Sequence, residues 1–214
     1  MPWGARIYNG AGSLSIGDDA SNFVLRYKQT VATSLIGTSF NGSFTSTTVA
    51  AKRPMAFANS SVNCTCVGQR DNGNGTWTIS FWVSGPVGTT ITIYIFDLAE
   101  TVASPWSWGV EIFKAAGVKS WFLGAKPMII RKFGAIGSLP AGRTWAARYS
   151  RLGGYGQTFQ YNFQNNVFAF RMEMGTIVET QPVWNAGNNP AGQPFGSWSN
   201  SGSTYLIAVD VTGY

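Results

Sequence analysis

The chain of 214 residues contains no histidine. Histidine is the commonest general base and metal ligand near neutral pH, so its absence excludes Ser-His-Asp and Cys-His catalysis. The two cysteines, Cys64 and Cys66, are too few to form a tetrahedral zinc site within one chain. The nine carboxylates show no spacing typical of a glycosidase pair. We therefore expect no enzyme activity, no cofactor and no metal.

Charged residues are also scarce, at 11% of the chain compared with roughly 25% in typical soluble domains. No apolar run reaches the roughly 18 to 20 residues that a membrane-spanning helix needs. The N-terminus lacks the basic-then-apolar order of a secretory signal, which indicates synthesis in a cytoplasm. Cys64 and Cys66 are expected to be free thiols, because residues two apart on a strand fit disulfide geometry poorly. A disulfide between them is the alternative.

The residues that are abundant favour strands. Aromatic residues make up 14% of the chain, and Val, Ile and Thr, which pack well on pleated surfaces, are frequent. Residues 76–83 alternate Thr or Ser with large apolar residues after an Asn- and Gly-rich turn at 71–75, and residues 90–96 supply the next strand. Further strands are expected at 23–29, 55–58 and 61–67. The sequence predicts an all-β protein of antiparallel β-sandwich modules.

A short repeat suggests how these modules are arranged. Residues 3–15 align without gaps on residues 108–120, with six identities in thirteen positions at an offset of 105. The first copy predicts two short strands around an Asn-Gly-Ala-Gly turn. Self-similarity at this spacing favours two modules in tandem, residues 1–100 and 105–214. A single sandwich with two similar hairpins is the alternative.

The second half contains two candidate contact surfaces. Residues 112–172 carry nine basic residues and no acidic one, which indicates a basic contact surface formed by Arg143, Arg148 and Arg151. Pairing with carboxylates of a neighbouring subunit, or simple exposure to solvent, is favoured there over nucleic-acid binding. Aromatic rings mixed with amides, as in an interface or a glycan site, are found at Trp184, Asn188, Asn189, Phe195, Trp198 and Tyr205. Most of these residues fall in an expected loop at 181–202.

Residues 158–173 are expected to form a long hairpin around a turn at 164–166.

The two copies of the repeat resemble a family of tail proteins of tailed bacteriophages. The resemblance is carried by a Gly-x-x-Ile-Tyr-Asn-x-x-Gly pattern in residues 4–12, and by Trp-Gly-x-x-Ile-Phe-x-x-x-Gly in residues 108–117 followed by Lys126-Pro127. The strand Ile93-Tyr94-Ile95-Phe96-Asp97, which precedes the second copy, also matches. The resemblance covers residues 1–133 and brings no catalytic residues.

This resemblance implies a virion structural protein located in the tail or tail tip. Its partners would be other tail proteins and copies of itself, with a host-surface glycan as a further candidate ligand. Self-association also accounts for nine tryptophans on a chain of low charge. The main alternative is a carbohydrate-binding β-sandwich module that uses the loop at 181–202, and the third class is a glycan hydrolase.

Overall fold

The computed structural model describes residues 7–8, 14–16, 22–36, 41–104, 107–114, 116–134, 139–150, 154–158, 162–188, 197–199 and 205–214. Within these ranges the protein is all-β, and its strand pairs are antiparallel. A single turn of 3-10 helix, η1 (Ala99–Thr101), follows β9. No helix among the described residues is long and apolar enough to span a membrane. The predicted all-β class with antiparallel β-sandwich packing is confirmed.

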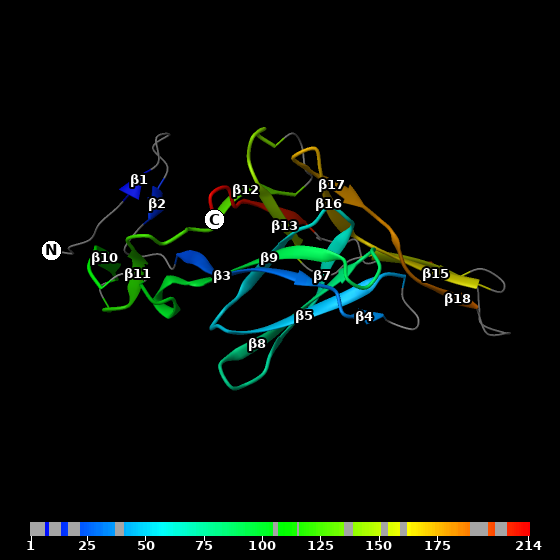
Figure 1. Ribbon diagram of the computed structural model, residues 1–214, viewed down its shortest axis with the longest axis horizontal. Coiled ribbons are helices and arrows are strands. Elements are labelled where there is room, and N and C mark those ends of the chain that lie inside the picture. The colour runs from blue at the N-terminus through cyan, green and yellow to red at the C-terminus, as the bar shows by residue number, and fades with distance from the viewer. Residues whose placement is uncertain are drawn as a thin grey trace.

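Two six-stranded sheets form the body of the molecule (Figure 1). The first sheet has the order β12 (Ile129–Phe133), β20 (Leu206–Asp210), β13 (Trp145–Tyr149), β6 (Met55–Asn59), β9 (Thr90–Leu98) and β3 (Phe23–Ala32). The second sheet has the order β17 (Thr176–Thr180), β16 (Ala169–Glu173), β7 (Cys64–Asp71), β8 (Thr76–Val83), β5 (Ser43–Ala50) and β4 (Leu35–Ile36).

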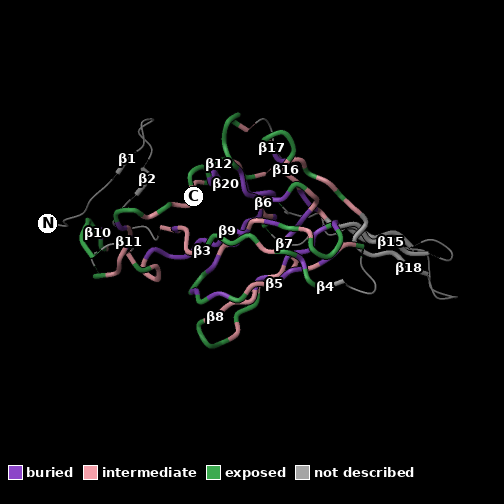
Figure 2. The backbone as a smooth tube through the Cα atoms, in the orientation of Figure 1, coloured by how far each residue is buried: buried purple, intermediate pink, exposed green. Residues whose placement is uncertain are grey.

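The main core lies between these two sheets, and it follows directly from the alternation of side chains. In β8 the apolar residues Ile79, Phe81 and Val83 are fully buried in this core. On the opposite face of β8, the Ser80 hydroxyl lies 2.7 Å from the Ser46 hydroxyl of β5. Figure 2 shows that buried residues follow the central strands of both sheets. The alternation of apolar and hydroxyl residues in the sequence of β8 therefore gives the strand one apolar and one hydroxyl-rich face.

The outer face of the first sheet is also apolar. Phe57 and Phe96 meet edge to face, with ring centroids 5.7 Å apart. Met128 and Tyr214 pack against this second cluster. The first sheet is therefore covered on both faces, which explains why β9 has an almost continuous run of buried residues.

The expected division into modules 1–100 and 105–214 does not separate these sheets. Strands β12, β20 and β13 of the second half complete the first sheet, and β16 and β17 complete the second. Strands of the two halves pair through few residues: Ala147 of β13 pairs with Ala58 of β6, and Phe170 of β16 pairs with Cys64 of β7. The strand order therefore places strands of both halves in each of the two sheets. Burying the apolar faces of the second-half strands against the existing core accounts for this difference.

Two other expectations about the second half are wrong. Residues 164–166 do not form a hairpin turn, because they lie inside β15 (Asn162–Val167). This strand belongs to a four-stranded sheet with the order β18 (Val183–Asn188), β15, β14 (Gly154–Thr158) and β19 (Ser197–Ser199). The expected loop at 181–202 therefore contains two strands. Asparagine suits turns by local preference, but pairing with two neighbouring strands overrides that preference here.

The sequence repeat corresponds to a repeated hairpin. In the first copy, β1 (Ile7–Tyr8) and β2 (Leu14–Ile16) pair Ile7 with Ile16 and Tyr8 with Leu14. In the second, β10 (Glu111–Phe113) and β11 (Lys119–Phe122) have the same pairs 105 residues later, Ile112 with Trp121 and Phe113 with Lys119. The register shifts at the same step in both. The prediction of a hairpin used twice is confirmed, and both hairpins lie at the left end of the molecule in Figure 1.

Candidate functional site

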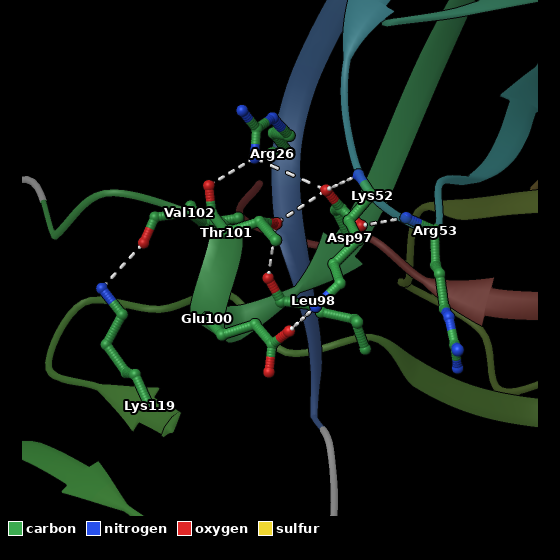
Figure 3. Close-up of polar contacts among 9 residues, drawn as sticks. All are labelled: Arg26, Lys52, Arg53, Asp97, Leu98, Glu100, Thr101, Val102 and Lys119. Carbon is green, nitrogen blue, oxygen red and sulfur yellow. Dashed lines mark hydrogen bonds and ion pairs between the residues drawn. The ribbon is translucent and has the colours of Figure 1, made fainter. Parts of the chain in front are cut away.

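A fully buried carboxylate, that of Asp97 near the end of β9, is held by several groups of the protein (Figure 3). Its Oδ1 accepts a hydrogen bond from the Arg53 backbone N–H at 2.8 Å, and its Oδ2 accepts one from the Lys52 N–H at 2.9 Å. The Thr101 hydroxyl donates to Oδ2 at 2.7 Å, and Arg26 Nη1 lies 3.5 Å from the same oxygen. Both oxygens are therefore occupied by groups of the protein itself.

The surroundings of Asp97 join the body to the second hairpin. The ammonium of Lys119 on β11 donates to the carbonyl of Val102 at 2.9 Å and lies 3.5 Å from the Glu111 carboxylate. Glu100 binds Lys52 at 2.5 Å. Because both oxygens of this buried carboxylate already accept hydrogen bonds from the chain, this network fixes structure.

The two cysteines are free thiols, as predicted. Burial is the main cause that raises the pKa of the Cys64 thiol well above its usual range, and burial likewise raises the pKa of Cys66. A protonated thiol is a poor nucleophile and a poor metal ligand. The described residues include no cluster of three or more His, Cys, Asp or Glu side chains that could hold a metal.

The predicted basic residues occupy different positions. Arg143 precedes β13, is half exposed, and lies 3.6 Å from the carboxylate of Asp210. Arg148 lies near the other end of β13, where its Nε donates to the Tyr149 carbonyl at 3.2 Å and its Nη1 to Gln69 at 3.4 Å. Arg151 lies outside the described residues. The two described arginines are thus held by groups of this chain, and the structure does not assemble them into one basic surface.

The predicted aromatic and amide residues are divided between two sheets. Trp184 and Asn188 are on β18, and Trp198 is on β19, at opposite edges of the four-stranded sheet. Asn189 and Phe195 lie outside the described residues. Tyr205 immediately precedes β20 of the first sheet. The six residues are therefore not shown to form one site.

Tyr205 instead contacts a residue that the sequence analysis did not single out. Its ring lies 5.1 Å from that of Phe133, centroid to centroid, and the planes are tilted by 34°. Phe133 ends β12, the outermost strand of the first sheet, and is 60% exposed. Ile130 on the same strand is 47% exposed. We call Ile130, Phe133 and Tyr205 the edge patch. The pairing of β12 with β20 brings Phe133 close to Tyr205, so the spacing of these residues in the sequence could not have revealed the edge patch.

A second group of exposed apolar side chains lies on the second hairpin. Trp108 is 73% exposed, and Val110, Phe113 and Leu123 are also exposed. A recess of about 280 Å³ opens beside Trp108 and is lined by Ser104, Ser107, Trp108, Gly109, Val110 and Glu111. We call it the Trp108 recess. The Trp-Gly pair that begins the repeat marks this position in the sequence, but the repeat was interpreted as a hairpin and as part of the resemblance to phage tail proteins, not as a binding site.

A larger and more open depression, about 600 Å³, lies at the turn between β7 and β8. Its polar groups bond to one another: Asn72 Nδ2 donates to the hydroxyls of Thr76 and Thr78, and Asp71 accepts from the Gly73 N–H. These bonds are what the Asn- and Gly-rich turn requires. The depression therefore reflects turn chemistry rather than a ligand site.

No protein-family model matches the chain, and no curated protein or solved structure shows significant similarity to it. Functional inference therefore depends on the residues and the geometry of this chain.

Proposed function

We propose that this protein is a structural component of a bacteriophage tail or tail tip, which assembles with copies of itself and with other tail proteins and contributes to host attachment. The virion location is supported by the resemblance of residues 1–133 to phage tail proteins. The assembly role is supported by one observation above all, the edge patch on the outermost strand of the first sheet.

An outermost strand offers both backbone hydrogen-bonding groups and side chains to a neighbouring subunit. In β12 the exposed apolar residues Ile130 and Phe133 flank Arg131 and Lys132. Apolar rings surrounded by cationic side chains are typical of a protein interface, in which the rings supply affinity and the charges select the partner. This reading requires no catalytic group, which agrees with the absence of histidine from the sequence.

The assembly role is tested by measuring the mass of the full chain in solution between roughly 0.1 and 50 µM. We expect a concentration-dependent oligomer that is weakened about tenfold or more by Phe133→Ser, since full burial of a Phe side chain is worth roughly 1.5 to 3 kcal/mol. Met174→Ser is the matched control, because Met174 is an apolar side chain that is 99% exposed in the turn between β16 and β17, outside the edge patch. A chain that is monomeric throughout, or equal weakening by both variants, would contradict the proposed interface.

The virion location is tested separately by mass spectrometry of purified phage particles and by fitting the sandwich into a cryo-EM map of the tail. We expect the chain at a fixed copy number per particle. Particles that lack the chain and still contain a complete tail would refute the location.

A further inference from the structure

The Trp108 recess combines an aromatic surface with polar groups of several kinds. Trp108 supplies an exposed indole, Ser104 and Ser107 supply hydroxyls, and Glu111 supplies a carboxylate. A hydroxyl both donates and accepts hydrogen bonds, whereas an ionised carboxylate only accepts them. Together these groups can bind a molecule that has an apolar face and several hydroxyls around its rim.

We propose that the Trp108 recess binds a neutral pyranose unit of a bacterial surface glycan. The C–H face of the sugar ring packs on the indole of Trp108, and the ring hydroxyls donate to Glu111 and exchange hydrogen bonds with Ser104 and Ser107. At about 280 Å³ the recess lies near the lower limit of ligand sites, roughly 300 Å³, so it holds a short unit while the remaining glycan extends into solvent.

Charge decides in favour of a neutral sugar. The cation paired with Glu111 is the ammonium of Lys119, which also donates to the Val102 carbonyl and lies 4.9 Å from the centre of the Phe122 ring. Lys119 does not line the recess. An acidic sugar would therefore bring a second negative charge close to the carboxylate of Glu111, whose cationic neighbour among the described residues, Lys119, is already engaged.

The hairpin that carries the recess is fixed to the sandwich. Asn22 Nδ2 donates to the backbone carbonyl of Ser120 at 3.0 Å and to its hydroxyl at 2.9 Å. Phe122 is buried in a cluster with Val24 and Ala99. A site held by buried contacts and hydrogen bonds from the body is organised before the ligand arrives, which lowers the entropic cost of binding.

This inference deepens the attachment part of the proposed function and is tested on the full chain. Isothermal titration would use tetrasaccharides of glucose, galactose, mannose and N-acetylglucosamine, with a tetrasaccharide of galacturonic acid as the acidic probe. We expect at least one neutral probe to bind with a Kd of about 1 mM or tighter, and the acidic probe to bind at least about tenfold more weakly.

Two variants and one control assign the binding to the recess. Trp108→Ala is expected to weaken binding of the neutral probe by about tenfold or more. Glu111→Gln is expected to reduce the ratio of affinities for the neutral and the acidic probe. Met174→Ser, which changes an apolar side chain that is 99% exposed in the turn between β16 and β17, is expected to leave binding unchanged. If Trp108→Ala alters the circular-dichroism spectrum, Ser107→Ala replaces it, with an expected weakening of about threefold or more.

Three results would overturn the assignment: no neutral probe binding at about 10 mM, stronger binding of the acidic probe, or binding that neither recess variant changes. The mass of the oligomer is measured on the same samples. If the wild-type chain forms the oligomer but binds no glycan, only the glycan site in the recess is refuted. If the wild-type chain is monomeric but binds glycan, only the assembly interface is refuted.

Discussion

Replacing the buried carboxylate of Asp97 by an amide, Asp97→Asn, is expected to destabilise the whole sandwich. The substitution keeps the size of the side chain and changes only its hydrogen-bonding and charge. In the native protein both oxygens accept hydrogen bonds, from the backbone N–H groups of Lys52 and Arg53 and from the Thr101 hydroxyl. An asparagine has a single acceptor oxygen, so its NH₂ group would face at least one of these donors.

The magnitude follows from these contacts. An unsatisfied buried donor costs about 1 to 3 kcal/mol. Removing the negative charge also leaves Arg26, whose side chain is only 19% exposed, without its carboxylate partner. Removing one partner of a buried ion pair costs roughly 3 to 5 kcal/mol when both partners are fully buried. We therefore expect Asp97→Asn to lower the free energy of unfolding by about 3 kcal/mol, and the Tm by roughly 6 to 12 °C for a chain of this size.

Urea unfolding, followed by tryptophan fluorescence, measures this loss. Arg26→Gln should cost less, about 1 kcal/mol, because Asp97 retains its backbone and hydroxyl donors. Glu100→Gln is the matched control. It removes another carboxylate of the same region, but its partner Lys52 is 59% exposed, and such surface pairs contribute at most about 1 kcal/mol. The reasoning fails if Asp97→Asn lies within about 0.5 kcal/mol of the wild type, or if Arg26→Gln proves the more costly variant.

Two further predictions concern a close backbone contact and alkaline pH. Gly42→Ala should lower the free energy of unfolding in urea by about 3 kcal/mol, because the backbone φ is +116° and a Cβ would lie 2.3 Å from the Val83 carbonyl oxygen. Gly73→Ala is the control: its φ is +76° and a Cβ would have nothing within 4 Å, so it should cost only about 1 kcal/mol. Equal costs for the two variants would contradict the steric argument. The free energy of unfolding should fall as the pH rises from 8 to 11, because burial raises the folded-state pKa of the Cys64 thiol and raises that of Tyr214 to about 12. The unfolded chain then releases these protons at lower pH than the folded chain, so the stabilisation is complete below the unfolded pKa values and is lost as the pH rises above them. Cys64 should also resist alkylation by iodoacetamide at pH 8 until the protein is unfolded in urea, which intact-mass measurement follows. Two results would refute this account of the buried groups: an unfolding free energy that rises with pH, or rapid labelling of Cys64 in the folded chain.

Much of the local structure could be predicted from the sequence. The alternation in residues 76–83, the turn before them and the strand at 90–96 are found as β8, its turn and β9. The two hairpins of the repeat have not only the predicted strands but the same register. These features depend on neighbours a few residues apart, whose turn chemistry and side-chain period act within one hairpin.

The candidate site was less predictable. Tyr205 was chosen for its ring among the amides that precede it, yet its contact is with Phe133, 72 residues earlier. Arg143 and Arg148 were grouped by their spacing in a basic segment, yet each is bound to a different group of the sandwich. Such contacts arise when strands distant in sequence become neighbours, and no periodicity within either segment encodes them.

The sequence by itself therefore determined the all-β class, the duplicated hairpin and the absence of histidine chemistry, because composition, turn residues and alternation act locally. The tertiary structure alone decided that both halves share two sheets, that residues 164–166 extend a strand, and that Phe133 and Tyr205 form an exposed pair. The physical reason is that apolar faces are buried against whichever strands complete the core, and that choice is made by the whole chain at once.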